Sequence, residues 1–349
     1  MKDEPLELSC PAPRAGYERV VLAHGGGGRV MQRLIADVFV AAFEGRELRA
    51  QHDGAVLETS ARTAVTTDAF TVRPLVFPGG DIGSLAVHGT VNDLAACGAR
   101  PRWMTAAFVL EEGLELAVLR RLVASMASAA RAAGVTVVAG DTKVVEHGRG
   151  DGVYIATTGV GEVIAPRPIL PARVRAGDAI LVSGPVGDHG TAVMLAREGI
   201  GIEAAIESDA ASVWPAVEAL LEARVALHCL RDPTRGGLAA ALAEIAAGAQ
   251  VGMSIVEAAI PVRPEVADAC ELMGLDPLYV ACEGRLVVIV PERDATRARH
   301  VLRATAIGRD AQRIGSVVDA HRGIVTLIGE TGGERVLDLL SGEQLPRIC

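Results

Sequence analysis

The chain has 349 residues, of which 50% are apolar and 3% are aromatic, and its formal net charge is −9. Domains usually contain about 100–200 residues, so this length predicts about two domains, and the apolar content excludes intrinsic disorder as the dominant state. The acidic balance and scarce aromatic side chains argue against a nucleic-acid binder, and no apolar run reaches the ~18–20 residues that span a membrane. The six cysteines form no Cys-x-x-Cys pair, so we expect a reduced, cytoplasmic protein without a structural zinc site.

Strand-like and helix-like segments alternate through the first half. In chain order the sequence predicts a helix over 30–39, strands over 55–59 and 64–67, part of a helix over 92–97, a helix over 114–133, a buried strand over 135–139 and a strand over 153–160. The helix over 114–133 has amphipathic spacing, and Gly134 suits its C-terminal end. The strand after it is rich in β-branched residues, which is why we expect it to be buried.

Three prolines between residues 165 and 175 predict a connector, because proline stiffens the chain and lacks a backbone donor. A second α/β pattern follows, with strands over 179–183 and 285–290, helices over 191–197, 238–247 and 295–306, and a last ordered piece over 336–340. We therefore predict an N-terminal extension (1–19), a first domain (20–165), a second domain (172–340) and a mobile tail (341–349).

Several aspartates lie beside glycine or small residues at the ends of predicted strands. They are Asp53, Asp68, Asp93, Asp141 and Asp232. Converging carboxylates suit Mg²⁺, a hard cation that prefers oxygen ligands and bridges nucleotide phosphates. A single aspartate in such a place is more often a turn or helix-cap residue, so only the set as a whole predicts a site.

A run of glycines, Gly25, Gly26, Gly27 and Gly28, precedes the helix predicted over 30–39. Backbone N–H groups of such a loop can surround phosphate oxygens. The run matches neither the G-x-x-x-x-G-K-[ST] pattern nor G-x-G-x-x-G. By itself it is equally compatible with a flexible loop.

Lys143 and Glu283 are candidate proton-handling residues. Lys143 follows Asp141 by two residues, and Glu283 directly precedes an apolar strand. The sequence does not show that they meet, and each alone could be an ordinary surface charge.

Cys349 is the last residue of the sequence and lies on a segment that contains proline. A nucleophilic or carrier thiol must be accessible and able to ionise, and Arg347 could favour its thiolate. The alternative is a chance exposed cysteine. We expect the other five cysteines to be core residues.

The motifs that carry a resemblance occur in one order along the chain. They are His24-Gly-Gly-Gly-Gly, Thr67-Asp68, His88-Gly-Thr-Val-Asn-Asp-Leu-Ala, Gly140-Asp-Thr-Lys-Val, Ser183-Gly-Pro-Val-Gly-Asp-His-Gly, Asp232-Pro-Thr-Arg-Gly-Gly and Pro346-Arg-Ile-Cys. From about His24 to Cys349 the chain resembles the carbamoyl dehydratases of nickel–iron hydrogenase maturation. The acidic motifs are shared more widely with aminoimidazole ribonucleotide synthetase, selenophosphate synthetase and thiamine monophosphate kinase.

The resemblance implies a fold and a ligand set. The fold is two α/β domains of the aminoimidazole ribonucleotide synthetase type, and amino-terminal strands pair across a homodimer. ATP would be bound by the loop Gly25–Gly28 together with Asp68, Asn92, Asp93, Asp141 and Thr142. Mg²⁺ would be held by Asp53, Asp68, Asp93 and Asp232.

The resemblance also implies an activity. A partner carbamoyltransferase would load a carbamoyl group onto Cys349, ATP would drive its dehydration, and an iron-carrying scaffold complex would accept the cyanide. Lys143 and Glu283 would then handle protons. Two other functions stay open: a kinase or synthetase of the same superfamily that acts on a free small molecule, and a non-catalytic module that docks a partner.

Overall fold

The computed structural model describes residues 28–34, 55–58, 62–199, 206–329, 331–339 and 347–349. Its described strands form a five-stranded sheet in the first half of the chain and a seven-stranded sheet in the second. A short pair, β3 (Val76–Phe77) and β4 (Gly80–Asp81), precedes the first long helix. This two-part α/β architecture confirms the predicted fold class, whereas the extension 1–19 lies outside the described residues.

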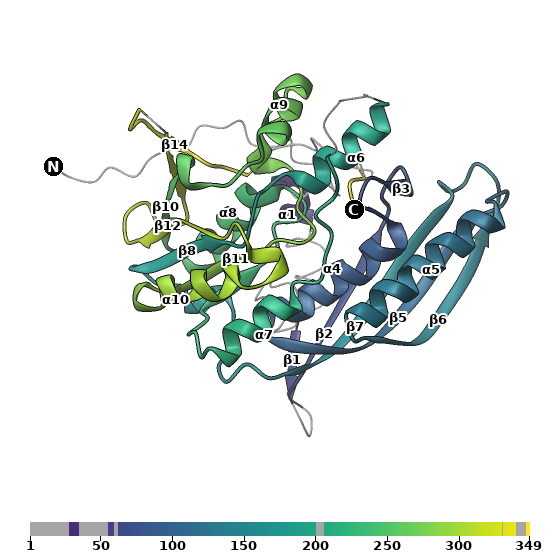
Figure 1. Ribbon diagram of the computed structural model, residues 1–349, viewed down its shortest axis with the longest axis horizontal. Coiled ribbons are helices and arrows are strands. Elements are labelled where there is room, and N and C mark those ends of the chain that lie inside the picture. Colours follow the sequence, from purple (N-terminus) through teal and green to yellow (C-terminus); the bar gives the residue numbers. More distant parts are fainter. Residues whose placement is uncertain (1–27, 35–54, 59–61, 200–205, 330, 340–346) are drawn as a thin grey trace.

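The five-stranded sheet has the order β1-β2-β7-β5-β6. Its strands are β1 (Ala55–Glu58), β2 (Arg62–Phe70), β5 (Ala99–Glu111), β6 (Thr136–Val145) and β7 (Val153–Val163). Only the β5–β6 pair is parallel among the described strands of this sheet. The helices α4 (Ile82–Ala96) and α5 (Leu116–Ala132) lie along this sheet in Figure 1. The predicted helix over 114–133 and the strands predicted over 64–67, 135–139 and 153–160 are therefore confirmed, whereas β5 was not predicted.

Helix α4 lies at the centre of the molecule and is buried along most of its length. Its start is fixed by a capping box. The Asp81 carboxylate accepts the N–H groups of Gly83 and Ser84, each at 2.9 Å, and the Ser84 hydroxyl accepts the N–H of Asp81. The helix packs on β2, β7 and α5. It thereby carries Asn92 and Asp93 to the junction between the two halves.

The strand after Gly134 is not buried as predicted. Val135 is buried, but Val138 and Val144 are 56% and 67% exposed on β6, and Trp103 on the neighbouring strand β5 is also exposed. Valine favours strands, but the residue type does not say whether another layer covers the strand. Because β6 is an edge strand of the described sheet, an apolar surface remains uncovered there.

The connector contains the 3₁₀ helix η3 (Pro171–Arg173), and the second sheet follows it with the order β14-β13-β10-β12-β8-β11-β9. Its strands are β8 (Asp178–Val182), β9 (Cys229–Arg231), β10 (Gly252–Val256), β11 (Val287–Pro291), β12 (Gln312–Val318), β13 (Val325–Ile328) and β14 (Glu334–Val336). Its helices are α6 (Asp188–Glu198), α7 (Trp214–Glu222), α8 (Gly237–Ala249), α9 (Pro264–Met273) and α10 (Glu292–Arg303).

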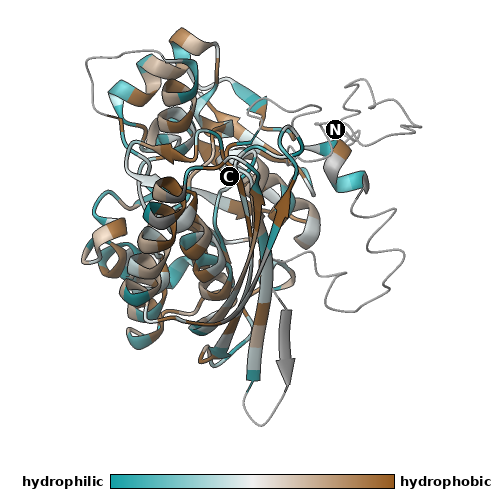
Figure 2. Ribbon diagram, turned by 90° about the vertical axis from the view of Figure 1, so that its right-hand side faces the viewer, coloured by the Kyte–Doolittle hydropathy of each residue, from teal (hydrophilic) through white to brown (hydrophobic). Residues whose placement is uncertain are grey.

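The central strands of the second sheet face two apolar cores. Along β8, Leu181 belongs to a core shared with α7 and α10, whereas its neighbours Ile180 and Val182 belong to a core shared with α8. Side chains alternate across a strand, so a strand covered on both faces needs an unbroken apolar run. Figure 2 shows hydrophobic residues, in brown, along the strands and on the helices packed against them.

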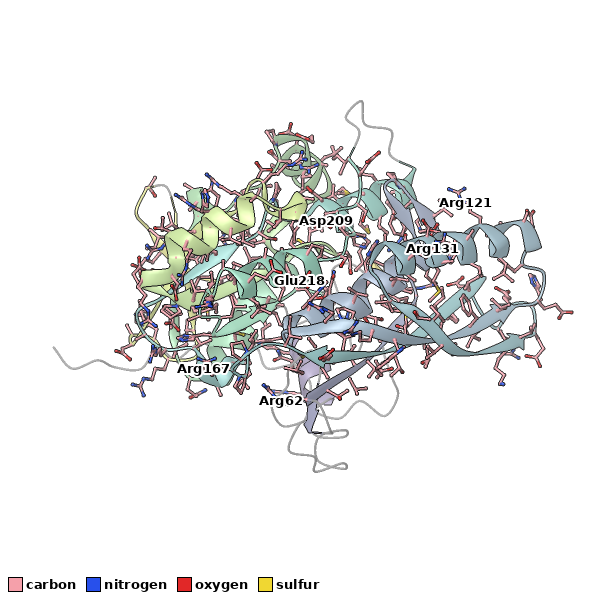
Figure 3. All side chains as sticks on the ribbon, turned by 60° about the horizontal axis from the view of Figure 1, so that its bottom comes forward. Arg62, Arg121, Arg131, Arg167, Asp209 and Glu218 are labelled. Atoms are coloured by element: carbon pink, nitrogen blue, oxygen red, sulfur yellow. The ribbon has the colours of Figure 1, made fainter. Side chains whose placement is uncertain are left out.

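The two halves are joined by polar contacts as well as by a shared core. Arg100 pairs with Glu218 at 2.7 Å, and Ser208 donates its N–H to the oxygen of Pro78 at 2.9 Å. In Figure 3, Glu218 lies in the central part of the molecule. The first helix, α1 (Arg29–Leu34), lies against the second half through Gln32, which bonds Glu244 on α8 at 3.3 Å. The part of the predicted helix beyond residue 34 lies outside the described residues.

Within the described segments, no helix is both long and apolar enough to cross a membrane.

Candidate active site

The end of the chain docks against the first half. Residues 347–349 run antiparallel to the segment that follows β2: the N–H of Thr71 donates to the oxygen of Cys349 at 3.0 Å, and the N–H of Arg73 donates to the oxygen of Arg347 at 3.2 Å. The chain end lies near β3 and α6 in Figure 1. Residues 340–346 are outside the described ones, so the mobility of the tail stays a prediction, whereas the position of its end is defined.

Ile348 anchors this end. It is 3% exposed and belongs to an apolar cluster with Phe77, Val193 and Ala281. Its main-chain oxygen lies 2.9 Å from Nε2 of His189 on α6. Because the contacts come from both halves, the docked tail closes their junction.

The docked thiol of Cys349 is buried, although the residue as a whole keeps some exposed surface. Burial, followed by the nearby Glu283 carboxyl, raises the pKa of this thiol well above its usual range. The expectation that Arg347 favours the thiolate is wrong, because its guanidinium pairs with Asp151 and lies 5.8 Å from the ring centre of Tyr154. In the docked position the sulfur is therefore a neutral thiol.

Glu283 is the buried acid beside this thiol. The residue is 1% exposed, and its Oε1 has no hydrogen-bond partner among the described residues. Burial raises the pKa of Glu283 well above its ordinary value, and the nearby carboxylates of Asp232, Asp68 and Asp209 act in the same direction, while Arg235 opposes them. A raised pKa makes the carboxyl a stronger base than an ordinary glutamate, so it is suited to take a proton from a bound group and to hold it.

Close backbone approaches hold Glu283 in place. Its N–H donates to Oδ1 of Asp209 at 2.9 Å, and a Cβ added to Gly284 would lie 1.9 Å from the main-chain oxygen of Asp209. The N–H of Cys282 donates to the oxygen of Pro233 at 3.0 Å, which ties the segment around Glu283 to the segment after Asp232. Glycine at 284 is therefore required for the two loops to touch.

The structure brings together some of the predicted aspartates. Asp68 and Asp232 both influence Glu283 and Cys349 electrostatically, so they lie in this site. Asp93, on α4, accepts a hydrogen bond from the Thr66 hydroxyl at 2.6 Å. Two predicted positions cannot be placed in the same way: Asp53 lies outside the described residues, and of Asp141 only the backbone, in β6, is described.

Among the described residues, no group of three or more His, Cys, Asp or Glu side chains is arranged to hold a metal ion. The donor chemistry nevertheless fits Mg²⁺, because carboxylates crowd one region where they raise the pKa values of Glu283 and Cys349. Mg²⁺ in nucleotide sites usually takes only one or two carboxylates and completes its shell with phosphates and water. Asp68 and Asp232 are the described carboxylates that could serve in this way.

The side chain of Asn92 makes three hydrogen bonds within the protein. Its side-chain amide donates to the oxygens of Ala211 at 3.0 Å and Glu283 at 2.9 Å, and its Oδ1 accepts the N–H of Val213 at 2.8 Å. Asn92 thus fastens α4 to the second half and positions Glu283. Its predicted contact with a nucleotide stays a prediction.

The remaining predicted residues lie on other elements. Gly28 is buried directly before α1, whereas Gly25, Gly26 and Gly27 lie outside the described residues. Lys143 is exposed on β6, where it pairs with Val109 of β5, and Thr142 precedes it with only its backbone described. The role of Lys143 in proton handling stays a prediction.

Sequence reasoning did not single out three residues that shape the site. Arg235 and His189 lie within motifs quoted above, so their motifs were a signal that could have found them. Asp209, which lies in the central part of the molecule in Figure 3, is outside every motif, and its role follows only from its approach to Glu283.

Comparisons with known proteins agree with this geometry. The model of the N-terminal domain of AIR synthase related proteins matches residues 51–163, and the model of their C-terminal domain matches residues 175–328. Carbamoyl dehydratase HypE of Cupriavidus necator is 53% identical over 333 residues, which are 95% of each chain. The Escherichia coli protein of the same name is 44% identical over 95% of this chain and 99% of its own.

Solved structures give the same result. A structure of HypE in complex with ATP has a TM-score of 0.81 and 48% identity, covering 95% of this chain and 100% of its own, and a HypE–HypF complex has a TM-score of 0.84 and 45% identity, covering 88% and 99%. AaThiL, solved with AMPPCP and TMP, has a TM-score of 0.68 but only 19% identity, so it shares the fold alone; the match covers 94% of this chain and 98% of AaThiL. The chain therefore belongs to the HypE family of carbamoyl dehydratases, within the AIR synthase related proteins, and is an enzyme of that family.

Proposed function

We propose that this chain catalyses the ATP-dependent dehydration of an S-carbamoyl group on Cys349 to an S-cyanate, which supplies the cyanide ligands of the nickel–iron hydrogenase iron centre. The observation that carries this proposal is the docking of the Cys349 thiol beside the buried carboxyl of Glu283, whose pKa is raised. The names of the relatives and the ATP complex of one of them support it.

The reaction balances as a phosphorylation followed by an elimination. The oxygen of the thiocarbamate, S–C(=O)–NH₂, attacks the γ-phosphorus of ATP, ADP leaves, and the nitrogen loses one proton. The C–O bond then breaks, phosphate leaves, and loss of the second N–H proton gives S–C≡N. In sum, thiocarbamate and ATP give thiocyanate, ADP, phosphate and a proton.

Each residue has a definite task in this scheme. Glu283, with its raised pKa, takes a proton from the carbamoyl nitrogen and holds it. Lys143 is assigned the second proton and the charge on the transferring phosphoryl group. Asp68 and Asp232 would hold Mg²⁺, which when bound neutralises phosphate charge.

The tail has to leave the site for loading and delivery, because its docked thiol is both buried and protonated. We assign the loading step to a carbamoyltransferase and the acceptance of cyanide to an iron-carrying scaffold complex, in the cytoplasm. The HypE–HypF complex of a relative supports a protein partner. We also propose that the first domain spans residues 20–165 and the second domain spans residues 172–340.

We also propose a homodimer formed through the five-stranded sheet. Trp103, Val138 and Val144 are exposed on the adjacent strands β5 and β6. Large apolar side chains that are exposed on neighbouring strands of one sheet are suited to an interaction surface. A second copy of the same sheet is the partner we assign to them.

The proposal is tested with Cys349→Ser, which removes the sulfur nucleophile but keeps the size of the side chain. With carbamoyltransferase, carbamoyl donor and ATP present, we expect this variant to form no cyanide. Cys97→Ala, which removes a buried thiol elsewhere, serves as the control and should remain active. If Cys349→Ser still gave ATP-dependent product, the enzyme would act on a free small molecule; a chain that binds no ATP would be only a docking module.

A further inference from the structure

The docked tail is held by a set of donors that recognises its main chain. Main-chain oxygens of residues 347, 348 and 349 all accept hydrogen bonds from the folded body. The donors are the Arg73 N–H (3.2 Å) and Arg197 Nη2 (2.6 Å) for Arg347, His189 Nε2 (2.9 Å) for Ile348, and the Thr71 N–H (3.0 Å) and hydroxyl (3.2 Å) for Cys349. We call these residues, with Asp151 and Tyr154, the tail slot.

The tail slot also recognises side chains. The guanidinium of Arg347 pairs with Asp151, lies over Tyr154, and donates from Nε to the oxygen of Thr71 at 3.1 Å. The side chain of Ile348 enters the apolar cluster of the junction. A charged residue in place of Ile348 would be buried without a partner, and an acid in place of Arg347 would meet Asp151, so both positions select the residue type.

The histidine of the slot is oriented by the protein body and not by the tail. Nδ1 of His189 lies 2.7 Å from the Ser208 hydroxyl, and its ring is perpendicular to the ring of Phe77, with 5.4 Å between centres and planes at 89°. The oxygen of Ile348 can only accept, so Nε2 carries the hydrogen and Nδ1 accepts from Ser208. Burial lowers the pKa of His189, which keeps the ring neutral in this arrangement.

The donors of the slot lie on two rigid supports. Thr71 and Arg73 follow β2, and Asp151 and Tyr154 lie at the start of β7, which pairs with β2. His189 and Arg197 lie on α6 of the second half. All of these groups belong to the folded body, so their recognition of residues 347–349 requires no covalent connection to that segment.

We propose that the tail slot is a peptide-binding site in its own right, which binds an extended Arg-Ile-Cys segment supplied in trans as well as the chain's own end. The recognition combines main-chain hydrogen bonds with side-chain pockets, as in other sites that bind extended peptides. The proposal deepens the proposed function, because a peptide that carries the S-carbamoyl group then becomes a substrate.

The binding step is tested on the full-length Ile348→Asp variant, in which the chain's own end is expelled and the slot becomes accessible. A fluorescent peptide Leu-Pro-Arg-Ile-Cys should bind saturably in an anisotropy titration. The peptide Leu-Pro-Arg-Asp-Cys should bind at least about 10-fold more weakly, because burying an unpaired charge is costly. Adding His189→Ala to the variant should weaken the binding of the first peptide, and the parent chain, with its slot filled, should compete poorly for it.

Equal binding of the two peptides, or no binding of either, would overturn the proposal. Thermal unfolding checks that Ile348→Asp is folded; if it is not, Arg347→Glu, which places an acid against Asp151, expels the tail without altering the apolar cluster. The same two peptides are then compared on that variant.

The turnover step, which rests on the proposed function, uses the S-carbamoyl form of the Leu-Pro-Arg-Ile-Cys peptide with ATP and the Ile348→Asp chain. We expect ATP-dependent loss of one water from the peptide, measured by mass spectrometry. Selective binding without dehydration would sustain the slot and contradict the proposed chemistry. Dehydration of the parent chain's own S-carbamoyl end, without selective peptide binding, would support the proposed chemistry and contradict the slot as a separate peptide-binding site.

Discussion

The two sheets of the molecule differ in how they are covered. In the seven-stranded sheet every residue of β8 and β11 is buried, because helices pack on both faces. In the five-stranded sheet the helices α4 and α5 pack along the strands, yet Val138 and Val144 of β6 remain exposed. The second half is thus a closed support, whereas the first half has an apolar surface that is suited to a partner.

The same difference divides the site. The second half supplies Glu283, Asp209 and Asp232, which are held by closely packed loops, and burial raises the pKa of Glu283. The first half supplies Asp68, on β2, which is only half-buried. The buried, closely packed side of the site, from the second half, thus faces a more exposed side from the first half. In this arrangement a proton can be held on the buried side while a charged ligand enters from the exposed side.

The largest effect is expected when the buried acid of the site, Glu283, is removed. Glu283→Gln keeps the shape of the side chain but cannot exchange a proton, so the rate of dehydration should fall by about 10²–10⁴-fold, which is typical for the loss of a general acid or base. ATP-dependent cyanide formation measures this rate. The matched control is Glu271→Gln on the exposed surface of α9, which should remain as active as the parent. Similar rates for both variants would remove Glu283 from the mechanism.

The close packing of the loops beside Glu283 is tested at Gly284. A methyl group there would lie 1.9 Å from the main-chain oxygen of Asp209, and backbone cannot move aside easily. Gly284→Ala should therefore lower the free energy of unfolding by about 1–3 kcal/mol, as overpacking usually does. Urea denaturation measures the change. Gly333→Ala, whose nearest neighbour would be 3.9 Å away, should change the free energy of unfolding much less, and equal losses would show that the loops yield.

The uncovered sheet is tested by a charge on β6. Val138→Glu should shift the protein from dimer to monomer in light scattering, because a carboxylate in an apolar interface loses its hydration without gaining a partner. Leu272→Glu places the same charge on an apolar residue of the second half that is even more exposed, and it should leave the dimer intact. Dissociation by Leu272→Glu alone would put the interface on the second half.

The smallest effect concerns the buried charges behind Glu283. Burial, with Asp209 nearby, raises the pKa of Asp188 from 3.8 to about 6, although Arg263 and Arg285 act against the rise. The folded state therefore binds a proton that the unfolded state releases, so the parent loses stability as the pH rises from about 4 to 6. The Asp188→Asn variant has no carboxyl at this position, so it does not lose this stability as the pH rises. In urea denaturation the stability of the variant relative to the parent should rise across that range; a constant difference would contradict the shifted pKa.

The elements of this fold could be predicted from the sequence because their patterns are local. The helix over 114–133 and the apolar strand before α10 were identified by periodicity and by uninterrupted apolar residues, and the structure contains both as α5 and β11. The burial of β6 was not predictable, since it depends on whether a second layer is present.

The site was predictable only where a motif carries it. Glu283 and Cys349 are brought together by contacts between segments far apart in the sequence, so periodicity could not reveal their meeting. Nearness in sequence was misleading for Arg347, which points to Asp151 instead of the thiol. Asp209 acts through a backbone contact with Glu283, for which no residue pattern exists.

The most direct test follows the terminal peptide by mass spectrometry, after the parent chain has received carbamoyl donor and carbamoyltransferase and then ATP. The predicted result is a carbamoyl adduct on Cys349 that loses one water only when ATP is added, and that persists undehydrated in Glu283→Gln. An adduct on another residue, or loss of water without ATP, would contradict dehydration at the docked end of the chain.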